Sequence, residues 1–131
     1  GNEPLSFALK VVRPVIKTIR IPINQQSGVD ISALSKTLKE FISSNVLCLL
    51  DSMVNDHLGG TGKAFDWNIA KILAQKFPFL LAGGLTPKNV AQAISQVNPW
   101  GVDVSSGVET NYMKDSAKIA AFVYAAKTCE A

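Results

Sequence analysis

The amino-acid sequence predicts one α/β domain built on four parallel strands, each followed by a helix, with one short helix in front. Two observations carry this prediction: short apolar runs alternate along the chain with segments of helical spacing, and the turns between them are brief. Because parallel strands need crossover connections, strict alternation implies right-handed strand–helix–strand units. The length of 131 residues suits one domain with a core of its own.

A short helix and a strand come first. Residues 2–13 carry apolar side chains at helical spacing, and Pro14 ends that pattern. Residues 15–21, VIKTIRI, alternate and are rich in β-branched side chains, which favours a strand. A polar turn is expected at 22–28.

The second helix begins at a capping side chain, either Asp30 or Ser32, and runs to about Ser43. Residues 46–50, VLCLL, then form a strand that is apolar on both faces, as in a parallel sheet covered by helices. This strand ends in Asp51.

A glycine-rich loop, DHLGGTGK, occupies residues 56–63. A nucleotide-binding P-loop requires a glycine five positions before Gly62 and a Ser or Thr after Lys63, but His57 and Ala64 stand there. The P-loop is therefore excluded, and we predict a mobile flap.

The next helix, residues 67–76, is capped by Asp66, and the apolar run 79–82 forms a third strand. That strand stops at Gly83 and Gly84, where no Cβ obstructs a ligand that approaches the backbone.

Another helix starts at Thr86 and Pro87, since threonine suits the N-cap and proline the first helical position. Asn98 and Pro99 end this helix. The fourth strand is residues 101–104.

Small residues follow both of these strands, namely Gly83, Gly84, Ser105, Ser106 and Gly107. Backbone N–H groups and hydroxyls at the carboxyl ends of two strands can form a phosphate cradle. Two ordinary strand–helix turns are the alternative interpretation of the same residues.

The last helix is capped by Asp115 and covers residues 116–127, with Ile119, Phe122 and Val123 expected to face inward.

Composition narrows the classes of function. The net charge of +3 is mild and the basic residues are scattered, which argues against nucleic-acid binding but is compatible with an anionic small molecule. Two cysteines form neither a disulfide framework nor a metal-ligand spacing, so a reducing, cytoplasmic setting is expected. No signal-peptide pattern or membrane-spanning apolar run occurs, and no membrane partner is expected.

Four segments together, LLDS, GGTGKAFDW, LLAGGLTPKNV and GVDVSSGVET, resemble the phosphoribosylanthranilate isomerase family of tryptophan biosynthesis. Members of that family are single-domain (β/α)8 barrels, and barrels of this kind need roughly 200 residues or more. The resemblance implies that residues 1–131 are one C-terminal half-barrel domain, family strands five to eight, and that the N-terminal half is absent.

The resemblance also implies roles for individual residues. Asp51 becomes the general acid, and its place after an apolar strand suits the rim where barrels catalyse; a turn-capping aspartate is the alternative. Substrate contacts fall to Asp103, Gly59 and Gly60, although Asp103 could equally be a buried structural acid. The phosphate site is assigned to Gly83, Gly84, Ser105, Ser106 and Gly107. No metal and no cofactor are implied.

The family's catalytic base is a cysteine in a motif of Lys, then Ile or Val, then Cys-Gly, and these 131 residues do not contain it. Neither Cys48 nor Cys129 stands at the matching position. The chain is therefore expected to be inactive by itself towards the family's phosphorylated substrate and to need an N-terminal half-barrel. A non-catalytic half-barrel that pairs with a second copy of itself, or a phosphate-sugar binding module, are the alternatives.

Overall fold

The computed structural model describes residues 2–21, 30–54, 64–65 and 67–129. Its centre is a four-stranded sheet in the order β1-β2-β5-β6, made of Ile16–Arg20, Leu47–Asp51, Leu80–Ala82 and Gly101–Val102. Every neighbouring pair in this sheet is parallel. The predicted parallel α/β sheet is confirmed.

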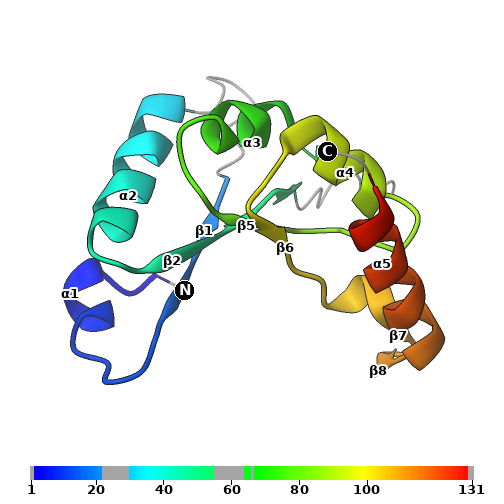
Figure 1. Cartoon of the computed structure of the whole chain (residues 1–131). Helices are drawn as coiled ribbons and strands as arrows, with labels where there is room; N and C mark the ends of the chain where they lie inside the picture. The colour runs from blue at the N-terminus through cyan, green and yellow to red at the C-terminus, as the bar shows by residue number, and fades with distance from the viewer. Residues whose placement is uncertain (1, 22–29, 55–63, 66, 130–131) are drawn as a thin grey trace.

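Helices α2 to α5 form an arc on the outer side of this sheet, and the strands lie along the inner side of the arc (Figure 1). The helices are α1 at Leu5–Ala8, α2 at Ile31–Ser43, α3 at Trp67–Ala74, α4 at Val90–Val97 and α5 at Ser116–Thr128. Each strand of the sheet is followed by a helix, as the sequence predicts.

The first helix is much shorter than predicted, because α1 makes a single turn instead of covering residues 2–13. Only Ala8 of this helix is buried, while Leu9 and Val12 beyond it are 58% and 98% exposed. A short helix without an apolar face to pack is marginal in water, so the helical spacing alone does not extend it.

Aspartate caps begin two of the longer helices. The carboxylate of Asp30 accepts a hydrogen bond from the Ala33 N–H at 3.0 Å, so Asp30 and not Ser32 caps α2. Asp115 caps α5, as predicted, by accepting from the N–H groups of Ala117 and Lys118. At the C-terminal end of α4, Asn98 adopts the left-handed conformation and ends the helix.

The two faces of the sheet differ in burial. Cys48, Leu50 and Leu81 point toward the helices and are completely buried. Ile16 points the other way and is 54% exposed, and Leu49 on the same inner face is half-buried. The core therefore lies between the sheet and the arc of helices, and the inner face stays open to solvent.

Two of the three inward positions predicted for α5 are wrong. Phe122 is buried, but Ile119 and Val123 are 41% and 45% exposed. The helix packs against α4 and against the 3-10 turn η1 at Ser106–Val108.

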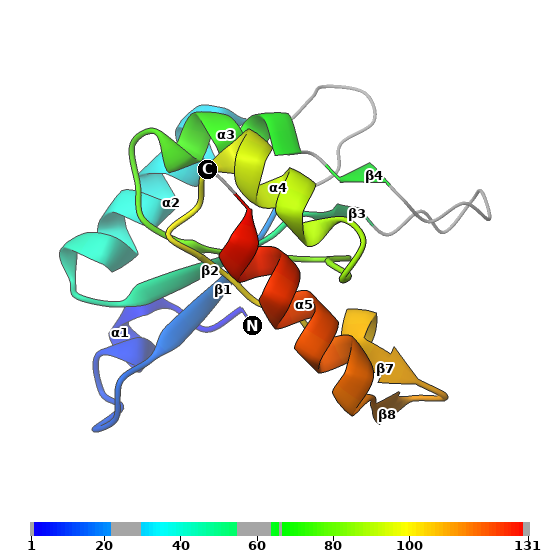
Figure 2. The same cartoon turned by 45° about the vertical axis from the view of Figure 1, so that its right-hand side comes forward.

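Two short antiparallel ladders were not predicted. Met53–Val54 (β3) pairs with Ala64–Phe65 (β4), and Glu109–Thr110 (β7) pairs with Met113–Lys114 (β8). The second ladder is a hairpin beside the first turns of α5 (Figure 2). The predicted flap at 56–63, the turn at 22–28 and the cap at Asp66 lie outside the described residues.

No helix in the described ranges is long and apolar enough to cross a lipid bilayer.

The two cysteines differ in environment, which predicts different reactivity. Burial raises the pKa of the Cys48 thiol to about 11, although the charge of Lys17 acts to lower it, whereas Cys129 is partly exposed. Because the thiolate is the reactive species, we expect a disulfide reagent at pH 8 to label Cys129 rapidly and Cys48 only in denaturant. Labelling of a Cys129→Ser variant follows Cys48 alone. Fast reaction of that variant without denaturant would show that β2 is not buried.

Candidate functional site

A cavity of about 280 Å³ lies at the carboxyl end of the parallel sheet. All the predicted site residues in the described part of the chain line it: Asp51, Asp103, Gly83, Gly84, Ser105, Ser106 and Gly107. Thr18, Leu49 and Ala82 contribute to its walls from the strands. The predicted substrate residues Gly59 and Gly60 lie outside the described residues.

Strand register places the two acids on one face of the sheet. Asp51 is the last residue of β2 and pairs with Arg20 on one side and Ala82 on the other. The Asp103 N–H donates to the Leu81 carbonyl at 2.9 Å, so Asp103 comes next to Ala82 in the same row. Two strand spacings separate the backbones of Asp51 and Asp103 by about 10 Å. In this chain Asp103 is exposed and not buried.

Ser52, which the sequence did not single out, fixes the end of β2. Its side chain is completely buried, and both its N–H and its hydroxyl donate to the Ala82 carbonyl at 2.9 Å. The Ile21 N–H donates to the Asp51 carbonyl at 3.3 Å from the other side. The backbone of Asp51 is therefore held between β1 and β5.

The first glycine turn depends on left-handed backbone, with φ of 97° at Gly83 and 64° at Gly84. Asn89 secures this turn, since its amide nitrogen donates to the Gly84 carbonyl at 3.0 Å and its oxygen accepts from the Thr86 N–H at 2.8 Å. Nothing in the sequence pattern identified Asn89, because one asparagine in a turn is common.

The start of the helix after this turn differs from the prediction. The Thr86 hydroxyl accepts from the Lys88 N–H at 3.2 Å, as an N-cap side chain does, but regular helix begins only at Val90. Residues 86–89 form a turn, and the Val90 N–H donates to the Thr86 carbonyl at 3.0 Å.

The two predicted phosphate turns are in direct contact. A Cβ atom on Gly107 would lie 1.8 Å from the Leu85 carbonyl oxygen and 3.2 Å from Thr86 Cα. Only glycine allows the second turn to approach the first this closely. One continuous wall of the cavity is therefore built from both turns.

Behind the second turn, the β7–β8 hairpin carries a set of charged groups. Lys114 Nζ donates to the Ser105 carbonyl at 2.9 Å and to Glu109 Oε1 at 2.6 Å. A hydrogen bond from the Thr110 hydroxyl lowers the pKa of Asp115, and the Lys118 backbone N–H adds to this effect. Among the described residues, Asp51 and Asp103 are the ionisable ones that line the cavity, and Lys114 contacts its wall from behind through the Ser105 carbonyl.

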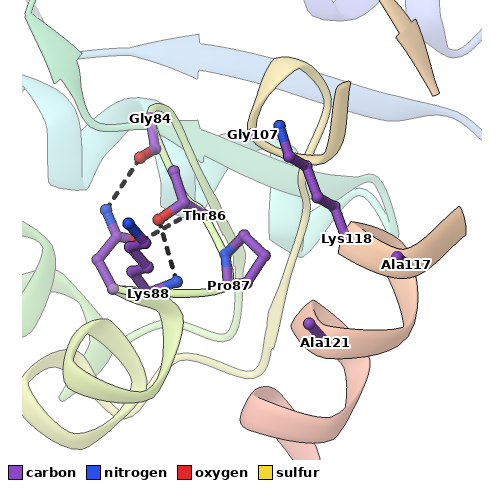
Figure 3. A pocket seen from close by; sticks show the side chains of 9 residues that line it. Gly84, Thr86, Pro87, Lys88, Gly107, Ala117, Lys118 and Ala121 are labelled. Atoms are coloured by element: carbon purple, nitrogen blue, oxygen red, sulfur yellow. Dashed lines mark hydrogen bonds between the residues drawn. The ribbon is translucent and has the colours of Figure 1, made fainter. Parts of the chain in front are cut away.

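A second, larger cavity of about 640 Å³ lies between the turn before α4 and the first turns of α5 (Figure 3). Pro87, Lys88 and Lys118 line it, and it shares Gly84 and Gly107 with the first cavity. It contains neither acid. The smaller cavity, which has both, is the candidate site.

Within the described ranges, no group of three or more His, Cys, Asp and Glu side chains is placed to hold a metal ion.

The sheet and the smaller cavity define a parallel α/β protein whose candidate ligand site lies beyond the carboxyl ends of the strands and is lined by small residues and two carboxylates. The chain belongs to the N-(5'phosphoribosyl)anthranilate (PRA) isomerase family, whose sequence model matches residues 2–125.

Individual relatives agree with this assignment. The chain is 47% identical over 128 residues to N-(5'-phosphoribosyl)anthranilate isomerase of Roseiflexus sp. (strain RS-1), an alignment that covers 97% of this chain and 56% of that protein. It superimposes on phosphoribosyl anthranilate isomerase from Thermotoga maritima with a TM-score of 0.73 and 34% identity, over 97% of this chain and 58% of that one.

A further relative in this family was solved in complex with reduced 1-(o-carboxyphenylamino)-1-deoxyribulose 5-phosphate. It is 31% identical, has a TM-score of 0.69, and is matched over 97% of this chain and 56% of its own. The chain thus spans little more than half the length of these relatives.

The close contact between the turns predicts contrasting effects of alanine at two glycines. Gly107→Ala places a methyl group against backbone atoms, and we expect unfolding free energy to fall by about 3 kcal/mol. Gly101→Ala meets only Leu80 Cδ2, at 2.7 Å, and that side chain can rotate, so a change of about 1 kcal/mol or less is expected. Denaturant unfolding of both variants tests this. Equal stability of the two would refute the contact between the turns.

Proposed function

We propose that this chain is the C-terminal half of a (β/α)8 barrel and that, together with an N-terminal half, it isomerises N-(5'-phosphoribosyl)anthranilate to 1-(o-carboxyphenylamino)-1-deoxyribulose 5-phosphate. The observation that carries the proposal is the gathering of Asp51, Asp103 and both small-residue turns around one cavity at the carboxyl end of the sheet. Family membership and the product analogue bound to a relative support the substrate class.

The open inner face supports the half-barrel part of the proposal. Side chains such as Ile16 and Leu49 would face the interior of a closed barrel, yet here they border solvent. The chain spans 56–58% of its relatives' length, which is slightly more than the half expected for four of eight strand–helix units. The N-terminal half could belong to the same natural polypeptide or to a separate one.

In this proposal Asp51 is the general acid of an Amadori rearrangement. It gives its proton to the furanose ring oxygen, so that the ring opens to an imine, and a base on the other half takes the proton from C2 to form an enolamine. Tautomerisation of the enolamine yields the ketose. Asp51 suits this role because it lies in the cavity on the face of the sheet that a substrate can reach.

Neither cysteine of this chain suits the role of the base. Cys48 is completely buried on the face toward the helices, and its raised pKa keeps it protonated at neutral pH. Cys129 follows α5 and is absent from the residues that line the cavity. The base must come from the other half.

The remaining roles follow the shape of the cavity. Gly83, Gly84, Ser105, Ser106 and Gly107 bind the phosphate through backbone N–H groups and hydroxyls. Asp103, exposed on the inner face, contacts the sugar or its amine. Gly59 and Gly60 are proposed to belong to a flap over the substrate. The proposed reaction requires no metal and no cofactor. Two free cysteines suit a reducing, cytoplasmic setting.

A complementation assay tests the proposal directly. The decay of phosphoribosylanthranilate fluorescence is followed with the 131-residue chain alone and after mixing with a separately produced N-terminal half that contains the missing cysteine motif. We expect turnover only in the mixture, because acid and base lie on different halves. Substantial turnover by the chain alone would refute the requirement for a second half.

Replacement of the proposed acid tests its role in the complemented assembly. Asp51→Asn keeps the size of the side chain but removes the proton donor, and kcat/KM should fall roughly 100- to 10,000-fold. Asp30→Asn is the matched control, because asparagine caps α2 as well as aspartate and the residue is not among those that line the cavity. Activity of Asp51→Asn close to that of Asp30→Asn would remove Asp51 from the mechanism.

Self-association without catalysis is the second candidate, and the apolar surface favours it. Ile16 on the inner face, with Ile119 and Val123 on α5, leaves apolar surface on which a second copy could pack. Sedimentation of the chain alone distinguishes the candidates: a dimer that blocks complementation supports self-association. A phosphate-sugar binding module would bind ribulose phosphates and stay inactive even with the N-terminal half.

A further inference from the structure

Lys114 holds the turn that follows the fourth strand of the sheet. Its ammonium group donates to the Ser105 carbonyl at 2.9 Å and lies 3.4 Å from the Ser105 hydroxyl. The third partner is Glu109, whose Oε1 atom is 2.6 Å away. Lys114 and Glu109 are directly opposite each other in the β7–β8 hairpin, so this short ladder holds both side chains beside Ser105.

The hairpin that carries Lys114 is itself fixed to α5. Lys118 Nζ donates to the Glu109 carbonyl at 2.7 Å, and the Asp115 N–H donates to the Val108 carbonyl at 2.8 Å. The Thr110 hydroxyl donates to Asp115 Oδ2 at 2.7 Å. These bonds fix the hairpin to α5, and the hydrogen bond from Lys114 to the Ser105 carbonyl therefore comes from a well-anchored backbone.

The carbonyl of Ser105 and the N–H of Ser106 belong to one peptide plane. In a trans peptide these two groups point in opposite directions, so a bond that fixes one also fixes the other. Lys114 contacts the carbonyl, and the Val108 N–H also donates to it at 3.3 Å. The Ser106 N–H is left on the opposite side of the plane, and Ser106 lines the cavity.

We propose that Lys114 is a positioning residue of the phosphate site: it orients the Ser105–Ser106 peptide so that the Ser106 N–H meets the phosphate group of the substrate. This inference rests on the proposed function of the same cavity. Lys114 does not line the cavity and reaches the ligand only through the peptide. Glu109 balances its charge, which makes its effect one of geometry more than of long-range attraction.

The first test uses inorganic phosphate and the 131-residue chain in isothermal titration calorimetry. Lys114→Met should raise the dissociation constant of phosphate about tenfold, since it removes a charge-assisted hydrogen bond behind the site. Arginine in Lys114→Arg can donate to the same carbonyl and pair with Glu109. The dissociation constant of phosphate for this variant should therefore stay within about threefold of that of the unsubstituted chain. Lys127→Met, in the last turn of α5, makes the same charge change away from the cavity lining and should have no effect.

Two readouts separate positioning from charge and from stability. The loss in Lys114→Met should persist at high ionic strength, where the attraction between an exposed lysine and phosphate is screened. The amide resonance of Ser106 should shift in Lys114→Met and return in Lys114→Arg. Should Lys114→Met not fold, Lys114→Gln, which also removes the charge but keeps a shorter donor, takes its place.

The outcomes distinguish this inference from the proposed function. Phosphate affinity that depends on Lys114, without turnover after complementation, upholds the positioning role and overturns the isomerase function. Turnover with unchanged KM in Lys114→Met upholds the function and overturns the positioning role; the expected result is a KM that rises with kcat little changed. The positioning role is also overturned if the loss of phosphate affinity in Lys114→Met disappears at high salt, or if the unsubstituted chain binds no phosphate.

Discussion

The register of the three strands β2, β5 and β6 is the constraint on which the site depends. Because Asp51 pairs with Ala82, and Asp103 follows beside Ala82, both carboxylates leave the sheet on its inner face and at the same height. A shift of one residue in β2 would turn Asp51 toward the helices, and the same shift in β6 would do so for Asp103. Ser52 protects this register, since its buried N–H and hydroxyl both bind the Ala82 carbonyl.

The aligned strand ends also bring the two small-residue turns together, and each turn is held from behind. Asn89 bonds the Gly84 carbonyl and the Thr86 N–H of the first turn, and Lys114 bonds the Ser105 carbonyl of the second. In trans peptides the N–H groups of Leu85 and Ser106 point away from the bonded Gly84 and Ser105 carbonyls, and both residues line the cavity. Carboxylates from the strands and small residues from the turns thus line one cavity, which is the basis for proposing a ligand with a sugar and a phosphate group.

Much of this could be predicted from sequence, because the signals were local. Apolar runs identified the four strands, Asp30 and Asp115 capped their helices, and the small residues after two strands marked the cavity. The hairpin at 109–114 was missed because Asn111 and Tyr112 both take positive φ, and tyrosine rarely does. Asn89 and Ser52 were missed because their roles depend on carbonyls of other strands and turns, which spacing along one segment does not reveal.

The open inner face connects the fold to the proposed requirement for a second half-barrel. Hydrogen bonds from N–H groups to a phosphate are weak in a cavity that water enters freely, and they strengthen when the walls exclude water. On the inner face of the sheet, Ile16 is exposed and Thr18 and Leu49 are only partly buried. An N-terminal half would therefore do more than supply a base. By closing the barrel over these side chains it would lower the local dielectric around groups that this half already holds in place, so recognition of the phosphate and catalysis should both improve on assembly.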